Sequence, residues 1–132
     1  MVLSVVSQLL LILARSAGLL GALTAAVLWA VFIFFNPYYS PDQGFNLAPY
    51  ATAIMMILLA VAAAWATLHV RPLILLVAFV GSFAPAGFYV LLTPSIFKWI
   101  GVADLLYLIA LLFMGGARLA SALGARIGEH RP

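Results

Sequence analysis

The sequence predicts an all-α integral membrane protein, folded as a compact four-helix transmembrane bundle. Of its 132 residues, 67% are hydrophobic and 7% are charged, whereas about 25% of the residues of a soluble domain are charged. The mean hydropathy is +1.26. Apolar stretches of about 20 residues match the thickness of the hydrocarbon core of a bilayer. Because these stretches take up most of the chain, we expect one membrane domain over residues 1–132.

We expect four spans, at about residues 17–35, 47–68, 73–92 and 102–119. A run of turn-forming residues after Phe35 ends the first span. Pro49 and Pro72 stand where the second and third spans begin, and a proline costs no hydrogen bond in the first turn of a helix. The remaining segments are outer loops at 36–46 and 93–101, an inner loop at 69–72 and a cytoplasmic tail at 120–132.

Residues 2–14 have two interpretations. Ser4, Ser7, Gln8 and Arg15 fall on one helical face, which favours a short interfacial helix that lies in the plane of the membrane surface. The alternative is a single long tilted helix from Val2 to Phe35. We favour the interfacial helix.

Small residues predict closely packed spans. Ala17, Gly21 and Ala25 recur at four-residue spacing in the first span, and alanines fill the second half of the second span. Such ridges let helix backbones approach each other in lipid. The partners that we expect are therefore the lipid bilayer and other membrane helices, from further copies of the chain or from a larger complex.

The third span contains a proline in its interior. Pro85 cannot donate a backbone hydrogen bond to the carbonyl of Gly81, and its ring crowds that carbonyl. With Gly81 and Gly87 on either side, we expect a helix kinked at Pro85. A broken helix whose carbonyls coordinate an ion is the less favoured alternative.

The cations predict the orientation of the bundle. Five arginines fall on one side of the membrane, among them the expected topology anchors Arg15, Arg71 and Arg118, and Lys98 alone falls on the other. The positive-inside rule then places both termini in the cytoplasm, and we expect the bacterial inner membrane. This distribution accounts for the net charge of +3 without a nucleic-acid partner.

Asp104 is the strongest candidate for a functional residue, because an acid within a span is costly and normally faces protein or water. Tyr107 lies one turn further along the same face, and Tyr89 and Lys98 are the other candidate polar residues. Lys98 precedes Asp104 by six positions, so the two do not share a face in a continuous helix. The structural alternative, which we favour, places Asp104 in the first turn of a helix near the outer surface, where the helix dipole stabilises an anion.

Several classes of activity have no support in the sequence. The chain has no cysteine, which excludes disulfides and thiolate metal sites. His69 and His130 have no second ligand at helical spacing, so we expect no metal and no cofactor. Phosphate-binding loops and catalytic sets are also absent. Aromatic residues towards the outer side form either an interfacial belt, the default, or a pocket for a quinone or lipid: Tyr38, Tyr39, Tyr50, Phe88, Tyr89, Trp99 and Tyr107.

Two families share part of this layout. An arginine that opens the first span, the run Phe35-Asn36-Pro37 and four compact spans are loosely similar to DoxX-like membrane proteins. No specific motif accompanies the similarity, so it implies nothing about activity. Small multidrug exporters share the size and the four spans, but they depend on an acid in the first span, which this chain lacks.

Two functions of different classes follow. The first is a non-enzymatic bundle that acts as an accessory subunit of a larger membrane complex or as a homo-oligomer. The second is a small transporter or channel for an ion or a small hydrophobic solute, which uses Asp104 and the kinked third span. A quinone- or lipid-linked enzyme is a weaker third possibility.

Overall fold

Helices alone make up the regular structure of the described residues, 1–35 and 47–129, in this computed structural model. Their order is α1 (Val2–Phe34), α2 (Leu47–Leu68), α3 (Pro72–Ser82), the π-helix η2 (Phe83–Gly87), α4 (Phe88–Leu91) and α5 (Lys98–Glu129). Because α3, η2 and α4 follow one another without a break, they form one rod, and the chain is a packed bundle of four helical rods.

Four helices are long and apolar enough to cross a membrane, as the composition predicts. They are Val2–Phe34, Leu47–Leu68, Pro72–Leu91 and Lys98–Gly128. The second has the predicted bounds and the third differs from its predicted bounds by one residue at each end. At about 1.5 Å per residue, these two are each roughly 30 Å long, close to the thickness of a hydrocarbon core.

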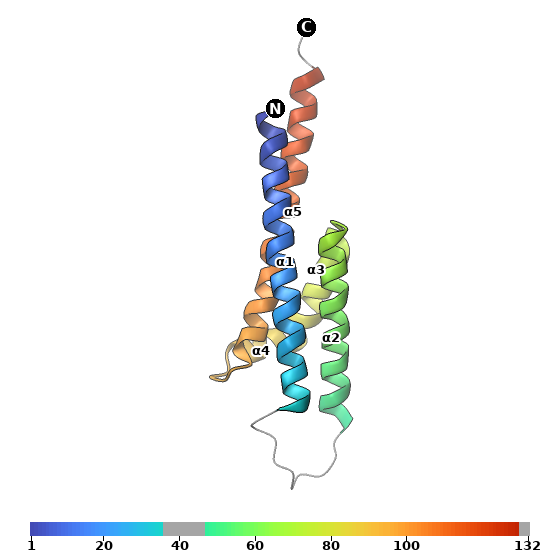
Figure 1. Cartoon of the computed structure of the whole chain (residues 1–132), viewed down its shortest axis with the longest axis vertical. Helices are drawn as coiled ribbons and strands as arrows, with labels where there is room; N and C mark the ends of the chain where they lie inside the picture. Colours follow the sequence, from blue (N-terminus) through green and yellow to red (C-terminus); the bar gives the residue numbers. More distant parts are fainter. Residues whose placement is uncertain (36–46, 130–132) are drawn as a thin grey trace.

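The two longest helices form the centre of the bundle. Helices α1 and α5 run side by side, and both termini lie at the same end of the molecule (Figure 1). Helix α1 also packs on α2, and the third rod packs on α2 through α3 and on α5 through α3, η2 and α4. One end of the α1–α5 pair extends well beyond α2 and α3 (Figure 1).

The prediction of a separate interfacial helix over residues 2–14 is wrong, because α1 is continuous over 33 residues. The polar side chains that suggested a water-facing stripe serve helix packing instead. Ser7 is 8% exposed, and its Oγ donates to the carbonyl oxygen of Ala117 in α5 at 3.1 Å. The Oγ of Ser121 lies 2.9 Å from the Oγ of Ser7. These contacts fix the first part of α1 upright against α5.

The fourth span is also longer than predicted. Helix α5 begins at Lys98, so the outer loop ends earlier than residue 101, and the helix continues to Glu129 where we expected a fraying tail. The physical reason is the length of α1: residues 2–14 offer a helical partner to the second half of α5. Buried Ala120 lies in this added length of α5.

Pro85 lies in the middle of η2, so the irregularity expected between Gly81 and Gly87 is a π-helical turn. The N–H of Phe88 donates to the carbonyl of Phe83, five residues earlier. A wider turn makes room for the pyrrolidine ring, which has no N–H to offer Gly81. The third rod thereby remains one candidate span, Pro72–Leu91.

The connection between α2 and α3 is a tight capped turn. The N–H of Arg71 donates to the carbonyl of Ala66 at 2.8 Å, and that of Val70 donates to Thr67 at 3.3 Å. This pair of bonds, together with the positive φ of 52° at Val70, is a Schellman motif. Pro72 then starts α3, and the two helices are antiparallel neighbours as the short loop predicts.

The small residues of the sequence pack inside this one chain. The buried members of α1 are Ala14, Gly18, Gly21, Ala22 and Ala25, and those of α2 are Ala53, Ala60, Ala63 and Ala66. Many of the small residues that suggested association with other proteins are therefore covered within the chain. Large apolar side chains, such as Leu20 and Leu58, remain exposed on the outside of the bundle.

Gly18 is a point of close contact between α1 and α2. A Cβ at this position would meet the side chain of Thr67, which is fully buried and donates to the carbonyl of Ala63 at 2.7 Å. We expect Gly18→Ala to lower the free energy of unfolding by about 1–3 kcal/mol, as overpacking does. Denaturant titration in mixed micelles measures the change.

A second substitution tests that explanation. Thr67→Ala removes the atoms that the new methyl group would meet, so the double variant is expected to recover part of the loss of Gly18→Ala. Additive losses in the double variant would contradict the proposed contact.

Some predictions lie outside the described residues. They are those for the outer loop 36–46, with Tyr38 and Tyr39, and those for residues 130–132, with His130 and Arg131.

Candidate functional site

Asp104 lies deep in the bundle, not near its outer surface as predicted. A Cβ on Gly21 in α1 would meet the carbonyl of Ala103 at 2.7 Å and a ring carbon of Tyr107 at 3.1 Å, so this part of α5 is level with Gly21. Along α1, Gly21 is roughly 9 Å from Arg15 and roughly 20 Å from Phe34 at 1.5 Å per residue. Asp104 therefore lies well inside the apolar part of the bundle.

The structural interpretation of Asp104 as a helix N-terminal anion does not hold. Helix α5 begins at Lys98 and has no acid in its first turn. The amides that are free at a helix N-terminus belong to that first turn, and Asp104 follows it. We predicted that this helix begins at about residue 102, which would place Asp104 in its first turn. The helix begins at Lys98 instead, so the first turn lies before Asp104 and the acid does not cap the helix.

The carboxylate touches both ends of the π-helix. Ser82, the residue before η2, donates from its Oγ to Oδ1 of Asp104 at 2.8 Å. Gly87, the last residue of η2, lies against Oδ2, so that a Cβ at Gly87 would collide with this oxygen. Asp104 is 1% exposed. The acid on α5 thus contacts both ends of the one irregular turn in the third span.

Two buried polar atoms at this site have no hydrogen-bond partner. Among the described residues, Oδ2 of Asp104 and the hydroxyl of Tyr107 are the buried side-chain oxygens in this condition. Tyr107 is also 1% exposed and lies one turn from Asp104 on the same face of α5. Most buried polar groups in proteins are paired, and exceptions gather at sites with a function.

Close backbone packing holds the site together. A Cβ on Gly101 would lie 2.6 Å from the carbonyl oxygen of Gly87 and 2.6 Å from the Cβ of Leu91. Glycine at 101 lets α5 approach the end of η2, and glycine at 87 leaves room for the carboxylate. By contrast, a Cβ on Gly81 would make only an ordinary contact, at 3.5 Å from a methyl carbon of Leu59. Of the three kink residues that we predicted, Gly87 is therefore the one that shapes the site.

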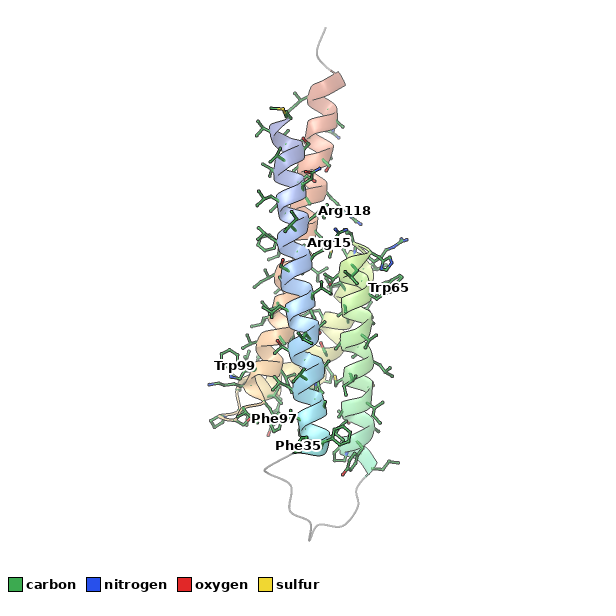
Figure 2. The ribbon with its side chains drawn as sticks, in the orientation of Figure 1. Arg15, Phe35, Trp65, Phe97, Trp99 and Arg118 are labelled. Carbon is green, nitrogen blue, oxygen red and sulfur yellow. The ribbon has the colours of Figure 1, made fainter. Side chains whose placement is uncertain are left out.

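The other two candidate polar residues lie elsewhere. Tyr89 is 73% exposed, and the ammonium of Lys98 lies 5.7 Å from the ring centroid of Trp99. Figure 2 shows Trp99 at the periphery of the bundle. The structure brings Tyr107 together with Asp104, and leaves Tyr89 and Lys98 outside this group.

The arginines expected as anchors lie near the level at which α2 ends and α3 begins (Figure 2). Nη2 of Arg15 lies 3.5 Å from the carbonyl oxygen of Leu68, at the C-terminus of α2. A cation near a helix C-terminus complements the helix dipole. Arg118 follows Ala117, the partner of Ser7, on α5 (Figure 2). Arg71 precedes α3 and is exposed.

A small cavity opens towards the end of the bundle where α1 ends and α2 begins. Its volume is about 250 Å³, and one of its residues, Ile100, lies one helical turn before Asp104 on α5. Of the aromatic residues predicted to gather on the outer side, Tyr89 lines it. The full lining is Trp29, Phe32, Tyr89, Val90, Thr93, Pro94, Ser95, Phe97 and Ile100.

The chemistry of the Asp104 site suits a proton better than a metal ion. Within residues 1–35 and 47–129, no three His, Cys, Asp or Glu side chains come together to hold a metal. A carboxyl group in apolar surroundings favours its neutral form over its charged form. When neutral, the carboxyl group can donate a hydrogen bond from Oδ2. When charged, it is stabilised by the hydrogen bond that Ser82 donates to Oδ1. The arrangement can therefore accept and release one proton.

This site belongs to a four-helix apolar bundle that carries a buried carboxyl group at a π-helical turn. Comparison with protein-family models, with curated proteins and with solved structures finds no match. What the site does is therefore argued from its own geometry.

Sequence reasoning found the acid but missed its partner. Ser82 is 22 positions away from Asp104, and no helical spacing connects the two residues. A polar side chain within an otherwise apolar span, three residues before an interior proline, was the available signal. It pointed to a polar contact but did not identify the neighbouring helix.

Proposed function

We propose that the protein is a small proton-coupled membrane protein, a transporter or channel, whose proton site is Asp104. The observation that supports this function is the contact of one buried carboxylate with both ends of η2. Acids within a membrane span mark ion or proton pathways in many proteins, and π-helical turns recur at functional sites.

The proposed mechanism couples the proton to the third span. In the charged state, the hydrogen bond from Ser82 stabilises the carboxylate, and the contact with Gly87 leaves Oδ2 unpaired. Protonation removes the need for the Ser82 bond and turns Oδ2 into a donor. Since Ser82 and Gly87 flank the π-helix, the change in hydrogen bonding acts on the turn that joins α3 to α4.

The rival function is an accessory subunit or homo-oligomer. It relied on small-residue faces, and many of these small residues pack within the chain. An apolar solute is compatible with the transporter proposal, because the small cavity is lined mainly by aromatic and aliphatic side chains. No feature of the described residues supports the third possibility, an enzyme.

We also propose an orientation and a location. Both termini lie at the end of the bundle where Arg15 contacts α2 (Figure 1), and the positive-inside rule favours the cytoplasm for that end. The proposed location is the inner membrane of a bacterium. The chain has no native cysteine, so labelling a cysteine placed at Arg126 with an impermeant reagent tests the orientation.

A titration of the carboxyl group tests the proton site without a known substrate. We expect the infrared carbonyl band of a protonated carboxylic acid to appear in the protein in nanodiscs as the pH falls. The contribution of Asp104 to this band should be missing in Asp104→Asn, whereas the other carboxyl groups of the chain, Asp42 and Glu129 among them, still contribute at low pH. Asp42→Asn is the matched control, because it removes the other aspartate of the chain.

The proposal fails if Asp104→Asn gives the same spectra as the natural protein over the full pH range. In that case Asp104 keeps one protonation state, and the site has only a structural role. Circular dichroism of each variant verifies that the helices are intact.

A further inference from the structure

One end of the α1–α5 pair extends beyond the part of the bundle that fits a membrane. Arg15 lies at the level of the end of α2, and the distance along α1 from Arg15 to Phe34 is about 29 Å, which fills the hydrocarbon core. Residues 2–14 then continue for roughly 20 Å past this boundary. We call residues 2–14 of α1, with residues 116–128 of α5 beside them, the overhang.

The overhang is held upright. Ser7 bonds to Ala117 and Ser121 across the two helices. A Cβ placed on Gly116 would lie 3.4 Å from the side chain of Leu10, and a Cβ placed on Gly124 would lie 3.6 Å from the side chain of Leu3. Because α1 is fixed to α5 along this length, its first half cannot fold down onto the membrane surface by itself.

The overhang has an exposed apolar stripe on α1, which we call the seam. Its side chains are between 41% and 73% exposed, and residues 2–14 contain no charged side chain. They fall on the a, d and e positions of two consecutive heptads, the repeat with which helices pair in coiled coils. The seam consists of Val2, Val5, Val6, Leu9, Ile12 and Leu13.

We infer that the seam is the contact surface of a homodimer, in which α1 helices from two copies pack in parallel. Copies in one membrane share one orientation, so the same heptad positions meet across a two-fold axis, a with a and d with d. The absence of charge on residues 2–14 means that this face meets itself without like-charge repulsion. A partner of different charge would find no complementary group on it.

The seam also continues into the membrane-spanning part of α1. Leu20, Leu23 and Val27 occupy the next e, a and e positions and are 57%, 64% and 51% exposed. The face from Val2 to Val27 is about 38 Å long and about 10 Å wide, so roughly 400 Å² per copy is covered. This is half the usual area for soluble partners, and confinement of both copies to one membrane plane favours the association.

Disulfide cross-linking tests the homodimer, because the chain has no native cysteine. Leu9→Cys places a thiol at an a position of the seam. Gln8→Cys places one at the same height but about 100° away around the helix, and Gln8 is also exposed. In liposomes at low protein density, we expect mild oxidation to give several-fold more covalent dimer with Leu9→Cys than with Gln8→Cys.

A second measurement uses no cysteine. Leu9→Glu puts two like charges face to face at the seam, and native mass spectrometry from lipid nanodiscs should then show monomers where the natural protein shows dimers. Since Leu9 is 55% exposed, the helical content should not change.

Three results would overturn the inference. Equal cross-linking at positions 8 and 9 would indicate random collisions, and no cross-linking at either would indicate separate copies. Quenching of a fluorophore at position 9 by lipids with a spin label in the acyl chain would show that lipid covers the seam. Each result is independent of whether Asp104 binds a proton.

Discussion

Replacement of Asp104 by asparagine is expected to abolish voltage-driven proton uptake into liposomes that contain the protein. Asparagine has nearly the same shape, and its side-chain oxygen can still accept the hydrogen bond that Ser82 donates at 2.8 Å. What the amide loses is the ability to bind and release a proton. A potassium diffusion potential supplies the driving force, and a pH-sensitive dye inside the liposomes reports the rate.

The expected rate for Asp104→Asn is that of protein-free liposomes, while Asp42→Asn retains the rate of the natural protein. Tyr107→Phe removes the second unpaired oxygen of the site but leaves its ring against Gly21. If the tyrosine hydroxyl passes the proton on, this variant slows the uptake, whereas a purely packing role leaves the rate unchanged. Natural protein that carries no proton current, or an Asp104→Asn variant that still carries one, would contradict the proposed function.

The fold class was predictable because the bilayer leaves few alternatives. A chain that is 67% hydrophobic satisfies its backbone groups in lipid through helices, and the thickness of the bilayer sets their length. The bounds of α2 follow from Pro49 near its start and from the short turn after Leu68. Hydropathy alone does not say where a helix ends when its neighbour also continues, and for this reason α1 and α5 are longer than predicted.

Residues 2–14 show the limit of periodicity. Ser4 and Ser7 at helical spacing define a polar edge, which is compatible with water and equally with a neighbouring helix. In the structure this edge faces a neighbouring helix. Ser7 donates a hydrogen bond to the carbonyl oxygen of Ala117, and its Oγ is within hydrogen-bond distance of the Oγ of Ser121. These residues are more than 100 positions away in the sequence, so their contribution depends on tertiary packing.

The candidate site was predictable in part for the same reason. An acid in an apolar span is conspicuous, and Tyr107 follows at helical spacing, so both were identified. Ser82 and Gly87 come from another helix, and Lys98 and Tyr89 were proposed only because they are polar and near in sequence. The depth of Asp104 depends on the packing of α5 on Gly21, which shows that the acid is far from the outer surface.

Gly101→Ala is expected to destabilise the protein by about 2 kcal/mol or more, because overpacking against backbone cannot relax as overpacking against a flexible side chain does. The new methyl group would lie 2.6 Å from the carbonyl oxygen of Gly87. To accommodate it, α5 and the third span must separate. The free energy of unfolding, from denaturant titration in mixed micelles, measures the loss.

Gly115→Ala is the matched control on the same helix. A Cβ at Gly115 meets nothing within 4 Å, so the variant should gain stability, by about 0.5–1 kcal/mol from helix propensity. Equal effects at the two positions would mean that α5 does not approach η2 as closely as the structure places it.

The separation forced by Gly101→Ala also pulls Ser82 away from Asp104. The carboxylate then loses the hydrogen bond that Ser82 donates.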